Sequence, residues 1–118
     1  MAFFDEMEPW EDVLVFDEVG FIHPTGGHTN GRLILTPIRL VFVTGGGLFG
    51  PKQKTEHAIN MNSIDGATLE PAETLGVVLR VDFTTSVGAY SARYHCRMAK
   101  AQKMVELINM RQDAGTLR

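Results

Sequence analysis

Apolar and polar residues alternate along much of residues 12–96, the period expected of β-strands rather than of helices. The pattern is clearest in residues 32–36 (RLILT) and 39–44 (RLVFVT), which flank Pro37-Ile38. Proline sets φ for a turn and cannot donate a hydrogen bond to a central strand, so the two stretches predict a β-hairpin. Alternate side chains share one face of a strand. The predicted core positions of the hairpin are Leu33, Leu35, Leu40 and Phe42.

Further segments are rich in β-branched and aromatic residues and also predict strands. Residues 12–23 predict one or two strands, and residues 55–70 predict two strands joined by a turn at Asp65-Gly66. An alternation of apolar and polar residues over residues 75–83 predicts a further strand, followed by a turn at Thr85-Ser86. The remaining predictions are a strand at 88–96, loops at 24–31 and 45–54, and a turn at 71–74.

The period changes after residue 96, where strong helix formers predominate. Apolar residues recur there at the spacing of one helix face, which predicts an amphipathic helix over residues 97–112, with Gly115 as its stop. The predicted apolar stripe consists of Met98, Ala101, Met104, Val105, Leu107 and Ile108. The chain is therefore expected to be mainly β with one C-terminal α-helix, divided into an N-terminal arm (1–11), a domain (12–112) and a short tail (113–118).

The hairpin sequence resembles that of the pleckstrin-homology-like superfold, in its GRAM and bacterial PH-domain branches. Gly31 to Thr36 and Arg39 to Phe42 match the pattern G-x-L-x-L-T-x-x-R-L-x-F of the second and third strands in such domains. Ile59 to Ile64 occupies the place of an I-x-x-I element that follows. The resemblance implies a bent β-sandwich or partly open barrel of about seven antiparallel strands, capped at one end by the helix.

The chain departs from this pattern in two places. Pro37 stands where these families often carry Asn, and the helix lacks the aromatic residue that plugs the core in many of them. Met104, Leu107 and Ile108 are expected to fill that space. Phosphoinositide-binding members usually place several basic residues between the first two strands, whereas here that loop offers His23, His28 and Arg32.

The net charge and the single cysteine exclude some classes of function. A net charge of −3 and a pI near 5.7 argue against a general nucleic-acid binder, which usually has a strongly basic domain. The single cysteine, Cys96, excludes an intrachain disulfide framework and fits a reducing compartment. The acidic N-terminus lacks the pattern of a secretory signal. We therefore expect a cytoplasmic protein.

The sequence does not support dinucleotide binding, metal binding or nucleophilic catalysis. The glycines from Gly45 to Gly50 fit the spacing GxGxxG, but the chain lacks the alternation of strands and helices that a dinucleotide site requires, so no cofactor is expected. The histidines and Cys96 show no metal-ligand spacing, so no metal is expected. No GxSxG element is present, and a buried inert thiol is the favoured reading of Cys96; no catalytic residue is assigned. Asp17-Glu18 is interpreted as a pair of strand-end charges without burial.

Binding is the remaining class. Aromatic and apolar residues dominate protein interfaces, and we expect contact with a protein partner or with a second copy of the chain. The residues assigned to this contact are Phe3, Phe4, Trp10, Leu48 and Phe49. The alternative is peripheral binding to a membrane or anionic lipid through the 45–54 loop, with Leu48 and Phe49 inserting beside Lys52 and Lys54. Further anion-binding residues of this alternative are Arg97, Lys100 and Lys103. Simpler readings stay open: a solvated helix face for Arg97, Lys100 and Lys103, folding of the Leu48-Phe49 loop back onto the sheet, and docking of Trp10 on its own core.

Overall fold

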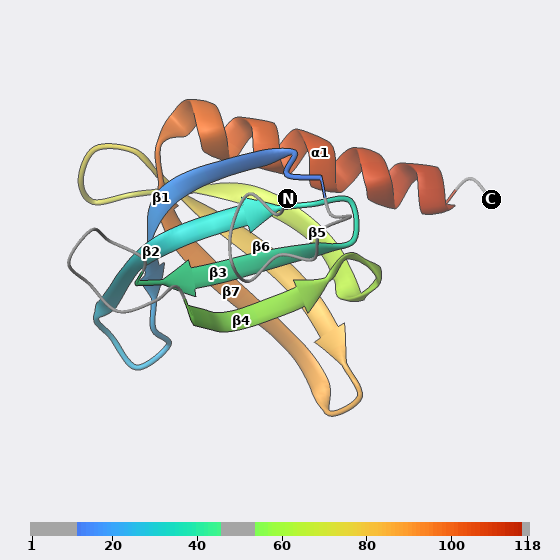
Figure 1. Ribbon diagram of the computed structural model, residues 1–118, viewed down its shortest axis with the longest axis horizontal. Coiled ribbons are helices and arrows are strands. Elements are labelled where there is room, and N and C mark those ends of the chain that lie inside the picture. The colour runs from blue at the N-terminus through green and yellow to red at the C-terminus, as the bar shows by residue number, and fades with distance from the viewer. Residues whose placement is uncertain (1–11, 46–53, 117–118) are drawn as a thin grey trace.

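The computed structural model describes residues 12–45 and 54–116, with side chains up to residue 111. These residues form seven strands and one α-helix (Figure 1). A short 3-10 helix, Met61–Ser63, joins the fourth and fifth strands. The elements are β1 (Val15–Ile22), β2 (His28–Leu35), β3 (Arg39–Thr44), β4 (Lys54–Asn60), β5 (Ile64–Pro71), β6 (Val77–Thr85), β7 (Gly88–Cys96) and α1 (Met98–Thr116).

All neighbouring strands are antiparallel and belong to one open sheet in the order β4-β3-β2-β1-β7-β6-β5. The sheet is curved, and α1 lies across one end of it (Figure 1). β1 joins the two halves, because it pairs with β2 along its full length but with β7 only from Gly20 to Ile22. The predicted fold class is confirmed: the chain is mainly β, with one C-terminal helix.

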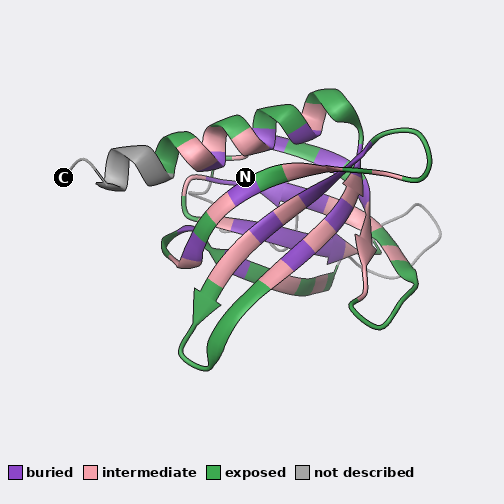
Figure 2. Cartoon of the chain, turned by 180° about the vertical axis from the view of Figure 1, so that it is seen from behind, coloured by how far each residue is buried: buried purple, intermediate pink, exposed green. Residues whose placement is uncertain are grey.

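The main core fills the concave side of the sheet. Leu33, Leu35, Leu40 and Phe42 are at most 1% exposed, so the core positions predicted for the hairpin are confirmed. Figure 2 shows buried positions as bands that cross neighbouring strands, as the alternation of side chains requires. The helix adds Ala101, Met104 and Ile108, each fully buried in the same cluster. Met98 is half-exposed, so the apolar stripe begins one turn later than predicted.

The Thr36 side chain explains why the hairpin turn has its sequence. Its buried hydroxyl accepts hydrogen bonds from the backbone N–H groups of Ile38 (3.3 Å) and Arg39 (3.1 Å), and it lies 3.2 Å from the Arg39 carbonyl, to which it donates. The Thr36 backbone N–H donates to that carbonyl as well (3.0 Å). One side chain therefore satisfies the polar groups of a tight turn that carries Pro37.

Three predicted boundaries are wrong. β2 begins at His28 instead of residue 32, because its first residues pair with the end of β1 (Ile22 with His28) and this pairing overrides the turn propensity of Asn30 and Gly31. The turn expected at Asp65-Gly66 is a β-bulge, and the chain turns earlier, in the 3-10 helix. Gly115 does not end α1, which continues to Thr116.

Candidate functional site

The two edge strands of the open sheet, β4 and β5, differ in whether their outward backbone groups have hydrogen-bond partners. Along β5, the side-chain amide of Asn109 on α1 pairs with the backbone of Ala67. Its Oδ1 accepts from the Ala67 N–H (3.1 Å), and its Nδ2 donates to the Ala67 carbonyl (3.0 Å). Ala67 is buried, so these two bonds replace the water that its backbone has lost. Asn109 therefore supplies, from the helix, the pairing that a neighbouring strand would give.

β4 is the other edge strand, and its register shows which backbone groups face outward. The Met61 N–H donates to the Ile38 carbonyl (2.8 Å), and in an antiparallel ladder such bonded pairs recur at every second residue. Ile59 and His57 therefore bond to β3, whereas the N–H and C=O groups of Ala58 and Asn60 point away from it. Both of these residues are exposed, and among the described residues no strand lies beyond β4.

The first half of β4 carries features that protect an edge from further pairing. The register shifts between Phe42 and Val43, which leaves Glu56 as an extra residue in a bulge. The Glu56 Oε1 atom accepts from the Thr44 hydroxyl (2.8 Å) and lies 3.9 Å from the Lys54 Nζ atom. Bulges and charged side chains discourage strand addition. The part of the β4 edge that stays suited to pairing is therefore Ala58–Asn60, which we call the open edge.

The inner side of β4 is rigidified by an aromatic cluster. The His57 ring stacks on Phe42 with centroids 5.2 Å apart, lies 4.8 Å from the Phe21 ring, and its Nε2 atom is 2.7 Å from the Tyr94 hydroxyl. Burial lowers the pKa of His57, partly opposed by Glu56, and burial raises the pKa of Tyr94. Both side chains are therefore neutral near pH 7, and they fix β4 to the core.

The basic residues proposed for anion binding already have neighbours. The Arg97 Nε and terminal nitrogen bond to the Asp17 carboxylate at 3.0 Å and 2.5 Å, and the Arg97 backbone N–H adds a 3.3 Å bond. Asp17 is 1% exposed, so the prediction that it is an unburied strand-end charge is wrong. The Arg97 carbonyl accepts the first helical hydrogen bond, from the Ala101 N–H, so Arg97 is the N-cap residue directly before α1. The Asp17 carboxylate caps this helix end by accepting from the Arg97 backbone N–H.

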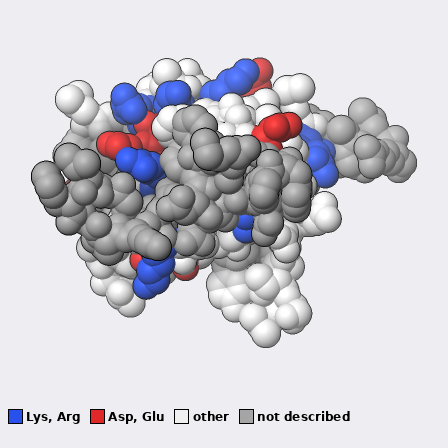
Figure 3. Space-filling model, in the orientation of Figure 1, with Lys and Arg blue, Asp and Glu red and all other residues white. Residues whose placement is uncertain are grey.

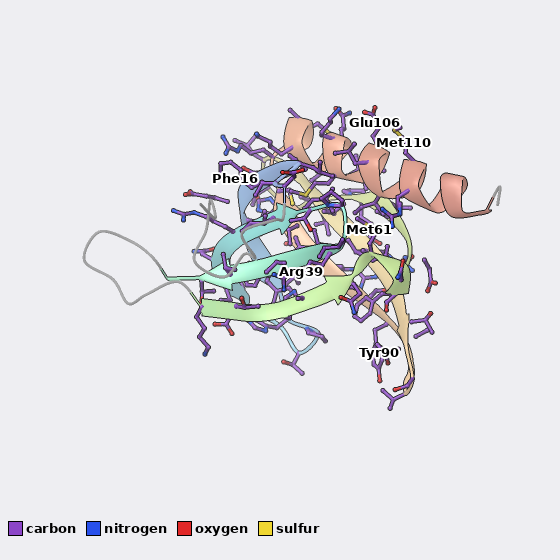
Figure 4. All side chains as sticks on the ribbon, turned by 45° about the vertical axis from the view of Figure 1, so that its right-hand side comes forward. Phe16, Arg39, Met61, Tyr90, Glu106 and Met110 are labelled. Carbon is purple, nitrogen blue, oxygen red and sulfur yellow. The ribbon has the colours of Figure 1, made fainter. Side chains whose placement is uncertain are left out.

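Lys100 and Lys54 are also placed next to other groups. The Lys100 Nζ atom lies 5.7 Å from the centroid of Phe16, on β1 beside the start of α1 (Figure 4). Lys54 faces Glu56, as described above. On the face shown in Figure 3, basic side chains are dispersed, and acidic side chains lie beside several of them. Lys103 is exposed on α1. Arg97, Lys100 and Lys54 therefore each lie beside an acidic or aromatic group of the described part of the chain.

Several predicted contact residues lie outside the described residues. This holds for the apolar group Phe3, Phe4, Trp10, Leu48 and Phe49, and for Lys52. Their assignment to a partner stays a prediction. The element that follows the glycine loop is strand β4, whereas a dinucleotide site needs a helix there.

The other chemical candidates are dispersed over the fold. Within residues 12–45 and 54–111, no three His, Cys, Asp or Glu side chains come together as metal ligands. Cys96 is buried, and burial raises its pKa to about 12, so its thiol is protonated at neutral pH. His95, its neighbour, points to the opposite face and bonds to the Leu75 carbonyl (2.7 Å).

A wide cavity of about 500 Å³ lies on the outer side of β1 and β2. Its polar lining includes Glu18, Asn30, Arg32 and His95, and Arg32 lies 3.8 Å from Glu18. These groups are partly exposed and of mixed charge. The lining combines no nucleophile with a base, and its charges partly offset one another.

Comparison with known proteins places the chain by shape alone. No family model and no curated protein matches the sequence. A crystal structure of the C-terminal domain of an unknown protein from Leishmania infantum matches with a TM-score of 0.55 and 12% identity. The match covers 86% of this chain and 85% of that chain, and supports the fold. Within the described residues, no helix is long and apolar enough to cross a bilayer.

Proposed function

We propose that the chain is a non-catalytic, PH-like interaction module that works through protein–protein contacts, and that a second copy of the chain pairs with its open edge. The observation that carries the proposal is the contrast between the two edge strands. The Asn109 side chain pairs with the Ala67 backbone on β5, whereas the outward groups of Ala58 and Asn60 have no strand beside them in the described part of the chain. An exposed edge is a template for strand addition.

The kinship with PH-like domains is supported by the physical roles of the motif residues. Thr36 organises the hairpin turn, and Gly31 lies where a Cβ atom would clash with the Val43 carbonyl and the Phe42 ring. Leu33 and Leu35 face the core. The pattern therefore reflects turn chemistry and close packing, which are the properties that members of one fold family share.

A two-fold antiparallel arrangement centred on Ile59 fits the open edge. Ala58 of one copy would face Asn60 of the other, and the two residues of each copy would exchange about four backbone hydrogen bonds. At a net ~1 kcal/mol each, these give about 4 kcal/mol. This only equals the lowest estimates of the entropy cost of association, also about 4 kcal/mol. The edge alone therefore supports weak pairing.

Additional apolar contact is needed to hold the pair. The segment that leads into β4 carries Leu48 and Phe49, which we assign to this role. Phe16 and Tyr90 are further large apolar side chains with considerable exposure; Tyr90 lies on the hairpin of β6 and β7, which extends from the body of the fold (Figure 4). Cytoplasmic localisation remains part of the proposal, since it fits the single buried cysteine.

Binding to anionic lipid ranks second. Arg97 is engaged by Asp17, Lys100 lies over Phe16, and Lys54 faces Glu56. A lipid headgroup would have to displace these contacts or bind through Lys52 and Lys103. The charge arrangement therefore favours a protein partner.

The test is the solution mass of the chain by light scattering, over a wide range of protein concentration and at low and high salt. Ala58→Pro removes an N–H that points away from β3, so the sheet keeps its ladder while strand addition is blocked. Ala58→Ser keeps that N–H and is the matched control. We expect concentration-dependent association of the natural chain and of Ala58→Ser, and a monomer for Ala58→Pro. A monomer throughout, together with salt-sensitive binding to anionic vesicles, would favour the lipid function instead.

A further inference from the structure

A second apolar cluster lies on the outer face of the sheet, away from the main core. It consists of Ile34, Val41 and Val43, with Val13 packed against it, and we call these four residues the outer patch. Ile34 pairs with Val41 across β2 and β3, and Phe16 and Ala58 continue the row on either side. Ile34 and Val41 are 0% exposed and Val43 is 1% exposed. Side chains on an outer face reach such values only beneath a covering layer.

The described elements do not supply that layer. The apolar stripe of α1 packs into the main core, on the opposite face of the sheet. Ala58, at one end of the row, is exposed, and Val13 is half-buried. Among the described residues, no element therefore accounts for the burial of the outer patch.

The path of the chain before β1 indicates which segment covers the patch. The Leu14 N–H donates to the Leu35 carbonyl (2.8 Å), so the chain still runs beside β2 at that point. Val15, Asp17 and Val19 face inward, and strict alternation would turn Val13 inward too. Val13 instead contacts the outer patch. Just before β1, the chain therefore lies on the outer face of the sheet.

We propose that residues 1–11 of the same chain cover the outer patch, with Phe3, Phe4 and Trp10 as the contacting side chains. Neighbouring strands lie about 4.8 Å apart, and 11 residues span about 35 Å when extended, so the segment is long enough to cross β2 and β3. Aromatic side chains bury more apolar area than others.

Charge complementarity supports the same occupant. The leading segment is acidic, with Asp5, Glu6, Glu8 and Glu11 among its residues. Arg32 pairs with Val43 on the outer face and also lies 3.8 Å from Glu18. Arg39 lies two residues before Val41, so alternation places both on the same face of β3. Lys100 lies over Phe16 at the β1 end of the row. Three basic groups therefore lie near the patch, one of them beside Glu18. This inference does not rest on the function proposed for the open edge, but it reassigns Phe3, Phe4 and Trp10 from a partner to the sheet of their own chain.

Trp10 is the single tryptophan of the chain, so its fluorescence reports on this contact alone. In the full chain we expect a blue-shifted emission and weak quenching by iodide, both independent of protein concentration. Val41→Asp places a charge beneath the segment and is expected to shift the emission to the red and restore quenching. Circular dichroism and thermal unfolding establish whether this variant stays folded.

A milder pair of variants keeps the test valid if Val41→Asp unfolds. Val43→Cys introduces a thiol at the patch, and buried Cys96 gives little background. We expect the new thiol to react slowly with an alkylating reagent in the full chain. It should react at least about tenfold faster when Phe3, Phe4 and Trp10 are all replaced by Ser, because reactivity follows access.

The matched control replaces Leu48 and Phe49 by Ser in the Val43→Cys chain and is expected to leave the rate unchanged. Acceleration in this control alone would assign the cover to residues 46–53 and overturn the proposal. A solvent-exposed Trp10 in the natural chain, or burial of Trp10 only at high protein concentration, would overturn it as well, the latter in favour of a second copy.

Discussion

Replacing Asn109 by alanine tests whether the helix closes the β5 edge. The substitution removes the two hydrogen bonds to Ala67, at 3.0 Å and 3.1 Å, and leaves a backbone N–H and C=O unpaired in a residue that is 3% exposed. Two such bonds contribute about 1–3 kcal/mol net, and more where water cannot reach the freed groups. Alanine is a better helix former than asparagine by roughly 0.6 kcal/mol, which offsets part of the loss.

The expected net result is a loss of about 2 kcal/mol in the free energy of unfolding, or roughly 8 °C in Tm for a domain of this size. Denaturant unfolding followed by circular dichroism measures it. Gln102→Ala, on the exposed side of the same helix, is the matched control and should lie within about 0.5 kcal/mol of the natural chain. Asn109→Asp keeps the acceptor but loses the donor, so an intermediate loss is expected.

Equal free energies of unfolding for Asn109→Ala and Gln102→Ala would contradict this role of the Asn109 side chain. That result would mean that the Ala67 backbone is satisfied without the side-chain amide, and that the two edges of the sheet do not differ as described. Light scattering on Asn109→Ala adds a second check, since an unpaired β5 edge is expected to promote association at concentrations where the natural chain is monomeric.

Three further predictions concern single side chains of the core. Burial lowers the pKa of His57 from its ordinary value of 6.5, so the unfolded chain binds a proton more readily. The stability that neutral His57 provides is therefore present above about pH 6.5 and is lost as pH falls below that value; the unfolding free energy of His57→Gln should depend less on pH over the same range. Gly31→Ala places a Cβ atom against the Val43 carbonyl and the Phe42 ring and should cost about 1–3 kcal/mol in denaturant unfolding, whereas no loss would show that the strands can separate freely. Cys96, with a pKa of about 12, should react with iodoacetamide at pH 8 far more slowly in the folded chain than in denaturant.

Local sequence predicted the parts of the fold that depend on neighbours in the chain. The hairpin of β2 and β3 was predictable because Leu33, Leu35, Leu40 and Phe42 alternate on both sides of a proline turn, and all four are buried. The helix was predictable from its period. Its last turns were not, because Gly115 is a weak stop when nothing after it forces the chain out of the helix.

Features that depend on distant partners were missed. Asp17 is buried because Arg97, 80 positions later in the chain, reaches its carboxylate, and no local pattern announces that pairing. Asn109 could have been suspected from the sequence, because it is a polar residue directly after Ile108 of the apolar stripe. The open edge of β4 follows only from strand order, which the sequence did not specify.

The most direct test of the central claim is the solution mass of the natural chain beside Ala58→Pro and Ala58→Ser. We expect that the natural chain and Ala58→Ser associate as protein concentration rises, and that Ala58→Pro stays monomeric with an unchanged thermal unfolding curve. Equal association of all three proteins would contradict pairing at the open edge, and a monomer at every concentration would contradict self-association itself.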